Sequence, residues 1–337
     1  MTSIATIRTT TLLALAGFTP VVALAQAPGV LNQLNGVQQR QELEQSAQQT
    51  VAPGDSAPEL YPGEESDVGP QSVLEIKPRR QLFEAMIDSQ FYHTDNVLLV
   101  DSAKYSTTVL VSTAQFALAP TPYDLWGGQF APAVGYSQQW FDYGLGDNVS
   151  TPYFHDVNTL DFNAQTMFAD LRWWTKPGLT AELGFNYLRL LSTSDYSSFY
   201  EEADPYAGLS ATIADDKVSG TFAYQASYHM PNGTTYDIDP DFNERFDSLL
   251  SISCIVKLSQ RFSVQPYGQY RYTHFFTDTS RNDQFGTFGL AAYYQVCRYC
   301  HVRAFLNYNL RRSDRADLAP NYEEFDAGAG VNVDIRF

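Results

Sequence analysis

Apolar and polar residues alternate with a period of two along most of the chain after Arg80, as in β-strands that have one apolar face. The final segment shows the pattern most clearly. Every odd-numbered residue from Phe325 to Phe337 is aliphatic or aromatic, and every even-numbered residue between them is Asp, Asn, Arg or Gly. A strand of this length, apolar towards lipid and polar towards a lumen, crosses the tilted wall of a transmembrane β-barrel.

The same alternation predicts earlier strands and one irregularity. The expected strands lie near 81–93, 105–118, 129–141, 159–173, 178–190, 204–214, 218–228, 246–257, 262–272, 287–296 and 302–310. The segment 159–173 changes phase, because Phe162 and Phe168 lie on one parity while Leu171 and Trp173 lie on the other. A β-bulge near Met167 would explain this change.

The lengths of the connections support a barrel. Long connections are expected near 94–104, 142–158, 191–203, 231–243, 275–283 and 313–323, and shorter ones near 119–128, 174–177, 215–216, 258–261 and 297–300. Outer-membrane barrels alternate long extracellular loops with short periplasmic turns and have an even strand number. The sequence therefore predicts an all-β fold, a closed antiparallel transmembrane β-barrel of about twelve strands over residues 81–337. The alternative, a soluble β-sandwich, does not require this alternation of loop lengths.

The N-terminal region has the pattern of an export signal. Arg8 is followed by an apolar run from Leu12 to Leu24, and Ala23-Leu24-Ala25 is a small-x-small cleavage site. We expect residues 1–25 to be a signal peptide, with Gln26 as the first mature residue. The run is too short for the alternative, an N-terminal membrane anchor.

Residues 26–80 differ in composition from the barrel segment. Gln and Asn are concentrated from Gln33 to Gln49, and Pro and acidic residues follow. This composition predicts a flexible Gln/Pro-rich periplasmic segment. Leu31, Leu34, Val37 and Leu43 have a loosely helical spacing, which predicts a short helix. Whether that helix plugs the barrel is open at this point.

Charge and cysteine content narrow the possible functions. The chain has 38 acidic and 21 basic residues, a net charge of −17, which argues against binding nucleic acid. Cys297 and Cys300 form a single CxxC with no second pair, and Cys254 is the third cysteine, whereas a zinc site needs four ligands. We expect no metal site and no cofactor. The CxxC is interpreted as a tight hairpin turn, with a disulfide as an open alternative.

Two segments resemble outer-membrane barrels of Gram-negative bacteria. The last strand, with Val333, Ile335 and the terminal Phe337 on one face, is similar to the C-terminal signature of these proteins. The resemblance implies recognition by the barrel-assembly machinery and a location in the outer membrane beside lipid and lipopolysaccharide. The segment Tyr92-His93-Thr94-Asp95-Asn96-Val97 resembles the "Y-x-D-N-hydrophobic" segment of outer-membrane porins of unknown substrate.

The polar faces of the strands carry charges of both signs and lead to the functional hypotheses. The residues expected to line the lumen are Asp161, Glu182, Asp247, Lys257, Arg271, Arg303, Asp334 and Arg336. The first hypothesis is a narrow passive channel for small solutes or a pore for polymer export. The second is a structural or adhesion barrel with a closed lumen, and a remote third is a hydrolase at the rim that uses His229. His93 and His274 have the opposite parity to their lumen-facing neighbours, and no GxSxG motif is present, so catalysis is not expected.

Overall fold

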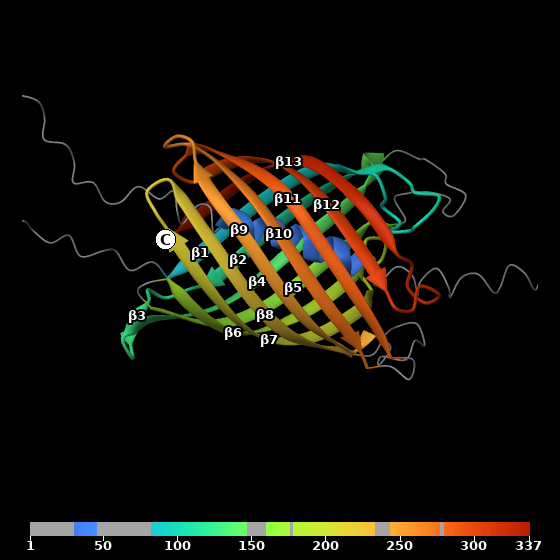
Figure 1. Cartoon of the computed structure of the whole chain (residues 1–337), viewed down its shortest axis with the longest axis horizontal. Helices are drawn as coiled ribbons and strands as arrows, with labels where there is room; N and C mark the ends of the chain where they lie inside the picture. Colours follow the sequence, from blue (N-terminus) through green and yellow to red (C-terminus); the bar gives the residue numbers. More distant parts are fainter. Residues whose placement is uncertain (1–29, 46–81, 147–159, 176–177, 233–242, 277–279) are drawn as a thin grey trace, which may run out of the picture.

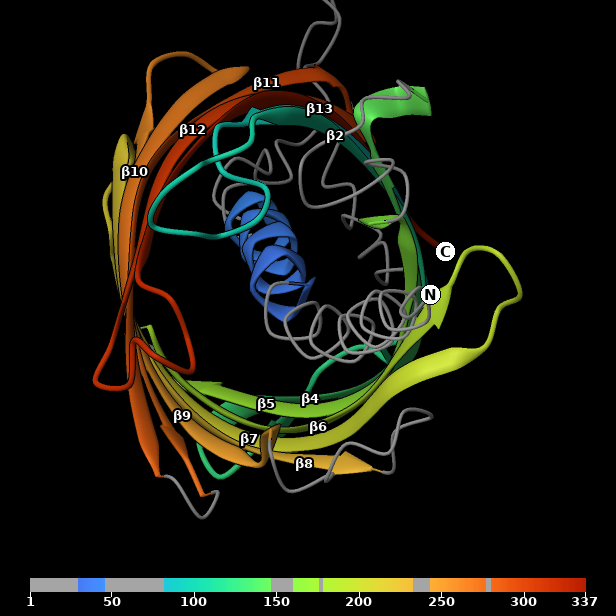
Figure 2. The same cartoon turned by 90° about the vertical axis from the view of Figure 1, so that its right-hand side faces the viewer.

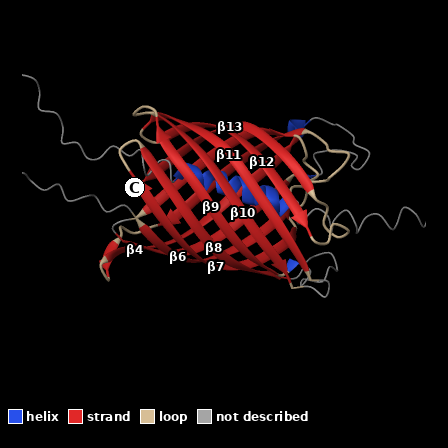
Figure 3. Ribbon diagram, viewed as in Figure 1, coloured by secondary structure: helices blue, strands red, loops and turns tan. Residues whose placement is uncertain are grey.

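The computed structural model describes residues 30–45, 82–146, 160–175, 178–232, 243–276 and 280–337. These residues form one antiparallel sheet of thirteen strands that curls into a barrel (Figures 1 and 3). The strands are β1 (Phe83–Thr94), β2 (Thr107–Leu118), β3 (Tyr123–Leu125), β4 (Gly128–Tyr143), β5 (Phe162–Thr175), β6 (Leu179–Ser192), β7 (Ser198–Ala214), β8 (Val218–Asn232), β9 (Arg245–Lys257), β10 (Phe262–Phe275), β11 (Arg281–Cys297), β12 (Cys300–Ser313) and β13 (Tyr322–Arg336).

Two pairings close the sheet. β13 pairs with β1 from Thr94↔Asp326 to Glu84↔Arg336, and β2 pairs with β4 across the short β3. The three-residue β3 pairs with β4 alone and forms a small hairpin at the barrel end. The prediction of a closed antiparallel barrel of twelve strands is confirmed, with β3 as an addition within the predicted 119–128 connection.

The barrel is polar inside and apolar outside. On β1, Asp88 and Gln90 are fully buried, while their neighbours Ile87 and Phe91 are 63% and 45% exposed. Large apolar side chains are exposed all around the outer wall, including Phe116, Leu171, Leu183, Leu209, Phe222, Ile252, Phe288, Leu306 and Val331. A closed barrel with this inverted polarity matches a lipid environment, in which all backbone groups are paired within the wall. Among the described residues, no helix has the length and apolarity to cross a membrane.

Residues 30–45 form an α-helix that lies inside the barrel (Figure 2). Leu31, Leu34 and Val37 recur at three-residue spacing and are all buried, so one helix face is apolar. Gln, Arg, Glu and Leu, which have high helix propensity, make up residues 38–45. The structure thus places the expected short helix in the lumen.

The apolar cluster around the helix explains the inward Phe162, one of the two phenylalanines that change the phase in β5. β5 pairs continuously with β4 and β6, so the β-bulge predicted near Met167 is wrong. Phe162 faces inward and is buried in the cluster that contains Leu34 and Val37, while Met167 faces outward and is 57% exposed. An apolar residue at an inward position is favourable where the lumen holds an apolar helix face.

The connections differ from the sequence expectation in two places. The predicted long loops at 191–203 and 275–283 shorten to residues 193–197 and 276–280, because β7 and β11 begin earlier than expected. Cys297 pairs with Cys300 across the two-residue turn between β11 and β12, so the predicted hairpin is confirmed. All three cysteines are free thiols. The predicted signal peptide and the segment 46–81 lie outside the described residues.

Candidate functional site

An apolar patch inside the barrel holds the first half of the helix. Leu34 and Val37 are 1% and 0% exposed. They belong to one cluster with inward side chains of neighbouring strands: Val109, Val111, Phe141, Tyr143, Phe162, Ala164, Leu188, Leu190 and Tyr200. Phe141 and Phe162 stack with their ring centroids 4.2 Å apart. This patch comes from β2 and from β4 to β7, and the same cluster continues to Tyr92 of β1 and Phe305 of β12.

Arg40 fixes the middle of the helix by stacking and hydrogen bonding. Its guanidinium lies over the rings of Tyr92 and Phe305, 4.8 and 4.7 Å from their centroids. Its Nε donates to Gln90 Oε1 at 2.8 Å, and Nη1 lies 3.9 Å from Asp326 Oδ2. Cation–π stacking is strongest where the cation is removed from water, as it is here.

Arg303 on β12 anchors the last turn of the helix. Its Nη1 and Nη2 donate to Asp88 Oδ2 and Oδ1 at 2.6 and 2.8 Å, and Nη1 also contacts Glu44 of the helix. Gln41 of the helix donates to Asp88 Oδ1 at 3.2 Å and to Thr113 Oγ1 at 2.9 Å. Arg303 and Asp88 are 1% and 0% exposed, so this is a fully buried ionic cluster.

The helix contacts also define its direction. Gln33 donates to the carbonyl of Val97, in the loop after β1, and accepts from the Tyr143 hydroxyl at the end of β4. Gln45 contacts the sulfur of Met86, near the start of β1. Residue 30 therefore lies towards the end of the barrel that carries the β1–β2 and β4–β5 loops, and residue 45 towards the end with short turns.

The segment Tyr92–Val97 joins the helix, the first loop and β13. The backbone amide of Phe325 donates to Asp95 Oδ1 at 2.7 Å. Asn96 Nδ2 donates to the carbonyls of Val100 and Glu323 at 2.8 and 2.9 Å. The side chains of Asp95 and Asn96 thus hold the loop and the β1–β13 seam together, which is a structural role for the acid and amide of this motif.

The other face of the helix borders an open polar cavity of about 180 Å³. Its lining is rich in amide side chains: Asn32, Asn35, Gln38, Gln39, Asn186, Gln225, Gln269 and Asn309. The lining also contains side chains that can carry charge. The wall contributes Asp204, His229, Asp247, Arg271 and Glu324, and the helix contributes Glu42. The lumen therefore holds both the helix and a polar cavity that borders it.

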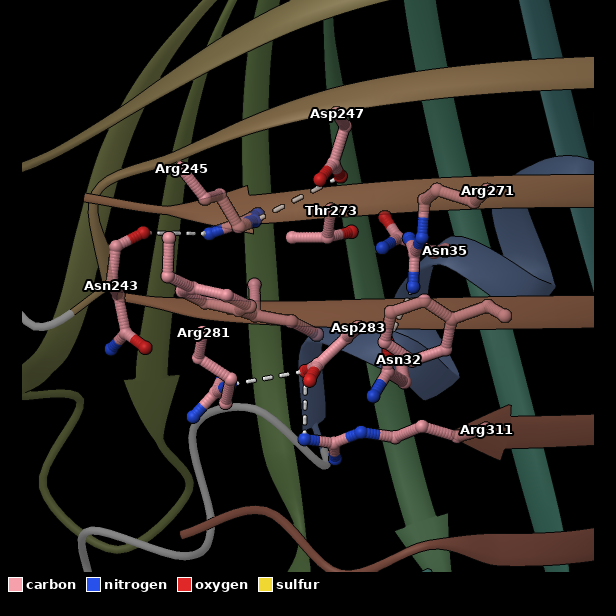
Figure 4. A pocket seen from close by; sticks show the side chains of 13 residues that line it. Asn32, Asn35, Asn243, Arg245, Asp247, Arg271, Thr273, Arg281, Asp283 and Arg311 are labelled. Atoms are coloured by element: carbon pink, nitrogen blue, oxygen red, sulfur yellow. Dashed lines mark hydrogen bonds and ion pairs between the residues drawn. The ribbon is translucent and has the colours of Figure 1, made fainter. Parts of the chain in front are cut away.

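A smaller pocket of about 30 Å³ adjoins this cavity near the first turn of the helix (Figure 4). Four arginines from four consecutive strands line it, together with two aspartates: Arg245, Asp247, Arg271, Arg281, Asp283 and Arg311. Arg271 lines both spaces, as do Asn32 and Asn35 of the helix. Figure 4 shows Arg271 directed towards the helix and Arg311 and Arg281 converging on Asp283.

His229 belongs to an ionic network at the inner wall. Its Nδ1 lies 3.2 Å from Glu202 Oε1, and its Nε2 lies 3.3 Å from Asp247 Oδ2 and 3.1 Å from Ser227 Oγ. Arg245 Nη1 donates to Glu202 Oε2 at 3.0 Å. In a Ser–His–acid triad the nitrogen that faces the serine has no carboxylate partner, whereas here both nitrogens face carboxylates. The geometry fits an ionic network better than a nucleophile and its base.

His93 and His274 do not join His229. His93 is exposed on the outer wall, and His274 contacts Asn282 and the ring of Phe276. His155 lies outside the described residues. The candidate rim hydrolase is therefore represented by His229 alone among these histidines.

The structure distributes the predicted lumen residues over three regions. Asp247 and Arg271 border the cavities, and Arg303 holds the helix. At the short-turn end, Glu182 accepts from Arg172 at 3.0 Å, Arg336 pairs with Glu84 at 3.2 Å, and Asp334 shares the inward parity. Lys257 lies two residues after the buried Ile255, so both are on the inward face of β9.

Asp161 is the exception among them. It precedes β5 rather than lying within it, and its Oδ1 accepts from the backbone amide of Tyr143 at 2.8 Å.

Sequence reasoning missed the charged residues of the helix and of the strand ends. Arg40 and Glu44 lie in a segment without strand periodicity, and Arg281 was within a predicted loop. Arg281, Asp283 and Phe285 alternate in step with the inward residues of β11. This alternation was the signal for a longer strand.

No protein-family model matches the chain, and no curated protein sequence matches it. Among solved structures, an outer-membrane channel from Pseudomonas putida F1 matches 80% of this chain and 100% of its own, with 10% identity and a TM-score of 0.48. The β-domain of the Bordetella autotransporter BrkA matches 76% of this chain and 100% of its own, with 11% identity and a TM-score of 0.40. An anion-selective porin from Comamonas acidovorans matches 76% of this chain and 99% of its own, with 9% identity and a TM-score of 0.39. At these identities and TM-scores, none of them assigns a function to this chain.

Proposed function

We propose that the protein is a channel of the Gram-negative outer membrane, with a lumen narrowed by the helix of residues 30–45. The observation that carries the proposal is the polar cavity of about 180 Å³ that remains between the helix and the wall. Barrels of about eight strands are filled by side chains, and barrels of sixteen or more hold wide aqueous channels. A twelve-strand barrel with a helix inside lies between these cases, so passage is restricted to small solutes.

The cavity lining supports passive passage. Amide and hydroxyl side chains exchange hydrogen bonds with a hydrated solute at low net cost. Export of a polymer is less well supported, since a chain of sugars or amino acids would need the space that the helix occupies. Asp247 and Arg271 border the remaining space, and among the predicted lumen residues these two are proposed to tune conductance.

The proposed orientation places the short turns in the periplasm and the long loops outside the cell. Gln45 contacts Met86, so the chain positions on both sides of residues 46–81 lie at the short-turn end. This supports a periplasmic location for the Gln/Pro-rich segment. The outer wall would contact lipid, and the outer rim would contact lipopolysaccharide.

The test is single-channel conductance of the refolded full-length protein in a planar bilayer, with a matched pair of helix variants. Val37→Asn places an amide in the apolar patch, where Val37 is 0% exposed, and should loosen the helix. Gln38→Asn creates the same residue on the cavity face and should leave the helix docked. We expect discrete steps for the wild type and Gln38→Asn, and larger steps for Val37→Asn.

The alternative function is a closed structural or adhesion barrel. It predicts no steps for any of the three proteins, although all three are folded and inserted. Equal conductance of Val37→Asn and wild type would retain the channel and reject the helix as its constriction.

A further inference from the structure

The arginine-lined pocket carries an excess of positive charge in a chain whose net charge is −17. Arg245 is balanced, because it shares Glu202 and Asp247 with His229. Asp283 is shared by two arginines, at 3.3 Å from Arg281 Nε and 2.9 Å from Arg311 Nη2. One carboxylate therefore faces two guanidinium groups at this point of the wall.

Arg271 is the second source of the excess. Its Nη2 donates to Asn32 Oδ1 of the helix at 2.7 Å, and its guanidinium lies 4.1 Å from the centroid of the Phe285 ring. No carboxylate of the described residues lies within 4.0 Å of its nitrogens. The nearby carboxylate of Asp247 is already engaged by His229 at 3.3 Å. Arg271 thus presents a charge that the described wall does not neutralise.

Several buried donors of this pocket have no hydrogen-bond acceptor among the described residues. They are Arg271 Nε, Arg281 Nε, Arg311 Nε and Thr273 Oγ1, and they outnumber the two buried acceptors of the pocket without a donor, Asp247 Oδ1 and Asp283 Oδ1. Buried donors in native proteins almost always have a partner, so a group of them in one pocket indicates a site for an acceptor. Leu31, Asn32 and Asn35 of the lumen helix also border the pocket.

We propose that Arg271, Arg281 and Arg311 form a binding subsite for the carboxylate of a small solute. Guanidinium groups bind carboxylates through short, charge-assisted and often bidentate hydrogen bonds. A pocket of about 30 Å³ admits such a group but not a whole solute. The body of the solute lies in the adjoining cavity of about 180 Å³, which Arg271 also lines.

The lining of the larger cavity narrows the class of solute further. Its amide side chains suit a body with many hydroxyl groups. Glu42, Asp204 and Glu324 also line it, and these carboxyl groups offer no positively charged partner to a second carboxylate on the ligand. The subsite therefore selects a polyhydroxylated monocarboxylate about the size of one sugar. This inference rests on the proposed function only in requiring that solutes reach the lumen.

The test is isothermal titration calorimetry of the full-length protein in detergent, which does not depend on conduction. Three ligands share one carbon skeleton and carry no, one and two carboxylates: glucose, glucuronate and glucarate. We expect glucuronate to bind at least about tenfold more tightly than the other two, since one charge-assisted contact corresponds to roughly that factor. Inorganic phosphate is titrated as well, to test whether the pocket prefers a different type of oxyanion.

Variants assign the binding to the pocket. Arg271→Gln should weaken glucuronate binding about tenfold, and Arg271→Lys should restore part of it by keeping the charge. Arg312→Gln is the matched control, since Arg312 adjoins Arg311 in sequence but is exposed and pairs with Glu323 at 2.6 Å. It should bind like the wild type.

Three results would overturn the proposal. They are equal binding of the three sugars, glucuronate binding that Arg271→Gln leaves unchanged, and binding of phosphate without binding of glucuronate. If glucuronate binds as expected while the bilayer shows no steps, the subsite stands and the channel proposal fails. If the bilayer shows steps while glucuronate does not bind, the channel proposal stands and the subsite fails.

Discussion

At the residue scale, the lumen depends on buried arginines whose partners come from distant parts of the sequence. Arg303 is 1% exposed, and it bridges Asp88 of β1 and Glu44 of the helix. A buried ion pair is costly to form, and it is costlier to break, because the remaining charge stays in a poorly solvated place. Such residues therefore determine how the helix and the wall fit together more than they add to net stability.

Replacing Arg303 by Gln should destabilise the folded protein by about 3–5 kcal/mol, because Asp88 would lose both of its guanidinium hydrogen bonds. The measurement is equilibrium unfolding in guanidinium chloride, in detergent, followed by tryptophan fluorescence. Arg312→Gln should change the free energy of unfolding by only about 0–1 kcal/mol, since its ion pair with Glu323 is exposed. Similar losses in the two variants would contradict the importance of burial.

At the element scale, the helix and the barrel differ in how they are held. Every strand is paired on both sides, apart from β3, whereas the helix is held by side-chain contacts alone among the described residues. Elements with few shared backbone hydrogen bonds open at lower free energy than the global fold. The helix is therefore the part of the described chain that can leave without unfolding the barrel.

We predict that amides of residues 31–44 exchange with deuterium faster than those of β9 to β12. Leu34→Ala removes contacts of a side chain that is 1% exposed, and should weaken helix docking by about 2–5 kcal/mol. Hydrogen exchange read by mass spectrometry should then show faster exchange in the helix and unchanged exchange in the strands. Gln38→Ala, on the cavity face, is the control and should behave like the wild type. If Leu34→Ala accelerated exchange throughout the barrel, the helix and wall would form one cooperative unit.

The terminal strand β13 supports a separate prediction about assembly. Phe337 is 64% exposed, its ring stacks on Phe83 with centroids 5.9 Å apart, and its backbone pairs with Phe83. If the assembly machinery reads the terminal aromatic residue, Phe337→Ala should strongly reduce the amount of heat-modifiable protein in the outer membrane of cells. Phe83→Ala removes the same stacking and leaves the terminus intact, so its yield should stay near that of the wild type. Equal yields of the two variants would assign Phe337 a packing role only.

At the scale of the whole molecule, strand periodicity was sufficient to predict the barrel but not its contents. Twelve strands and the β11–β12 hairpin follow from alternation, because the outer wall must be apolar whatever fills the lumen. The inward positions carry no such constraint. Phe162 is apolar because it packs in the cluster that includes Leu34 and Val37 of the helix, and Asp88 is charged because it pairs with Arg303. Both the cluster and the ion pair join segments far apart in sequence. For the same reason Arg271 could be predicted as a lumen residue, while its grouping with Arg281 and Arg311 could not.

The orientation of the whole barrel can be tested with a native thiol. Cys297 is an exposed free cysteine at the β11–β12 turn, on the end with short connections, while Asp317 is in the β12–β13 loop at the opposite end. With short turns in the periplasm, a membrane-impermeant maleimide should not label the wild type in intact cells and should label it once the outer membrane is permeabilised. Asp317→Cys should be labelled in intact cells. Labelling of the wild-type protein in intact cells would reverse the assignment, and the Arg271 subsite, near the loop-bearing end, would then face the periplasm instead of the medium.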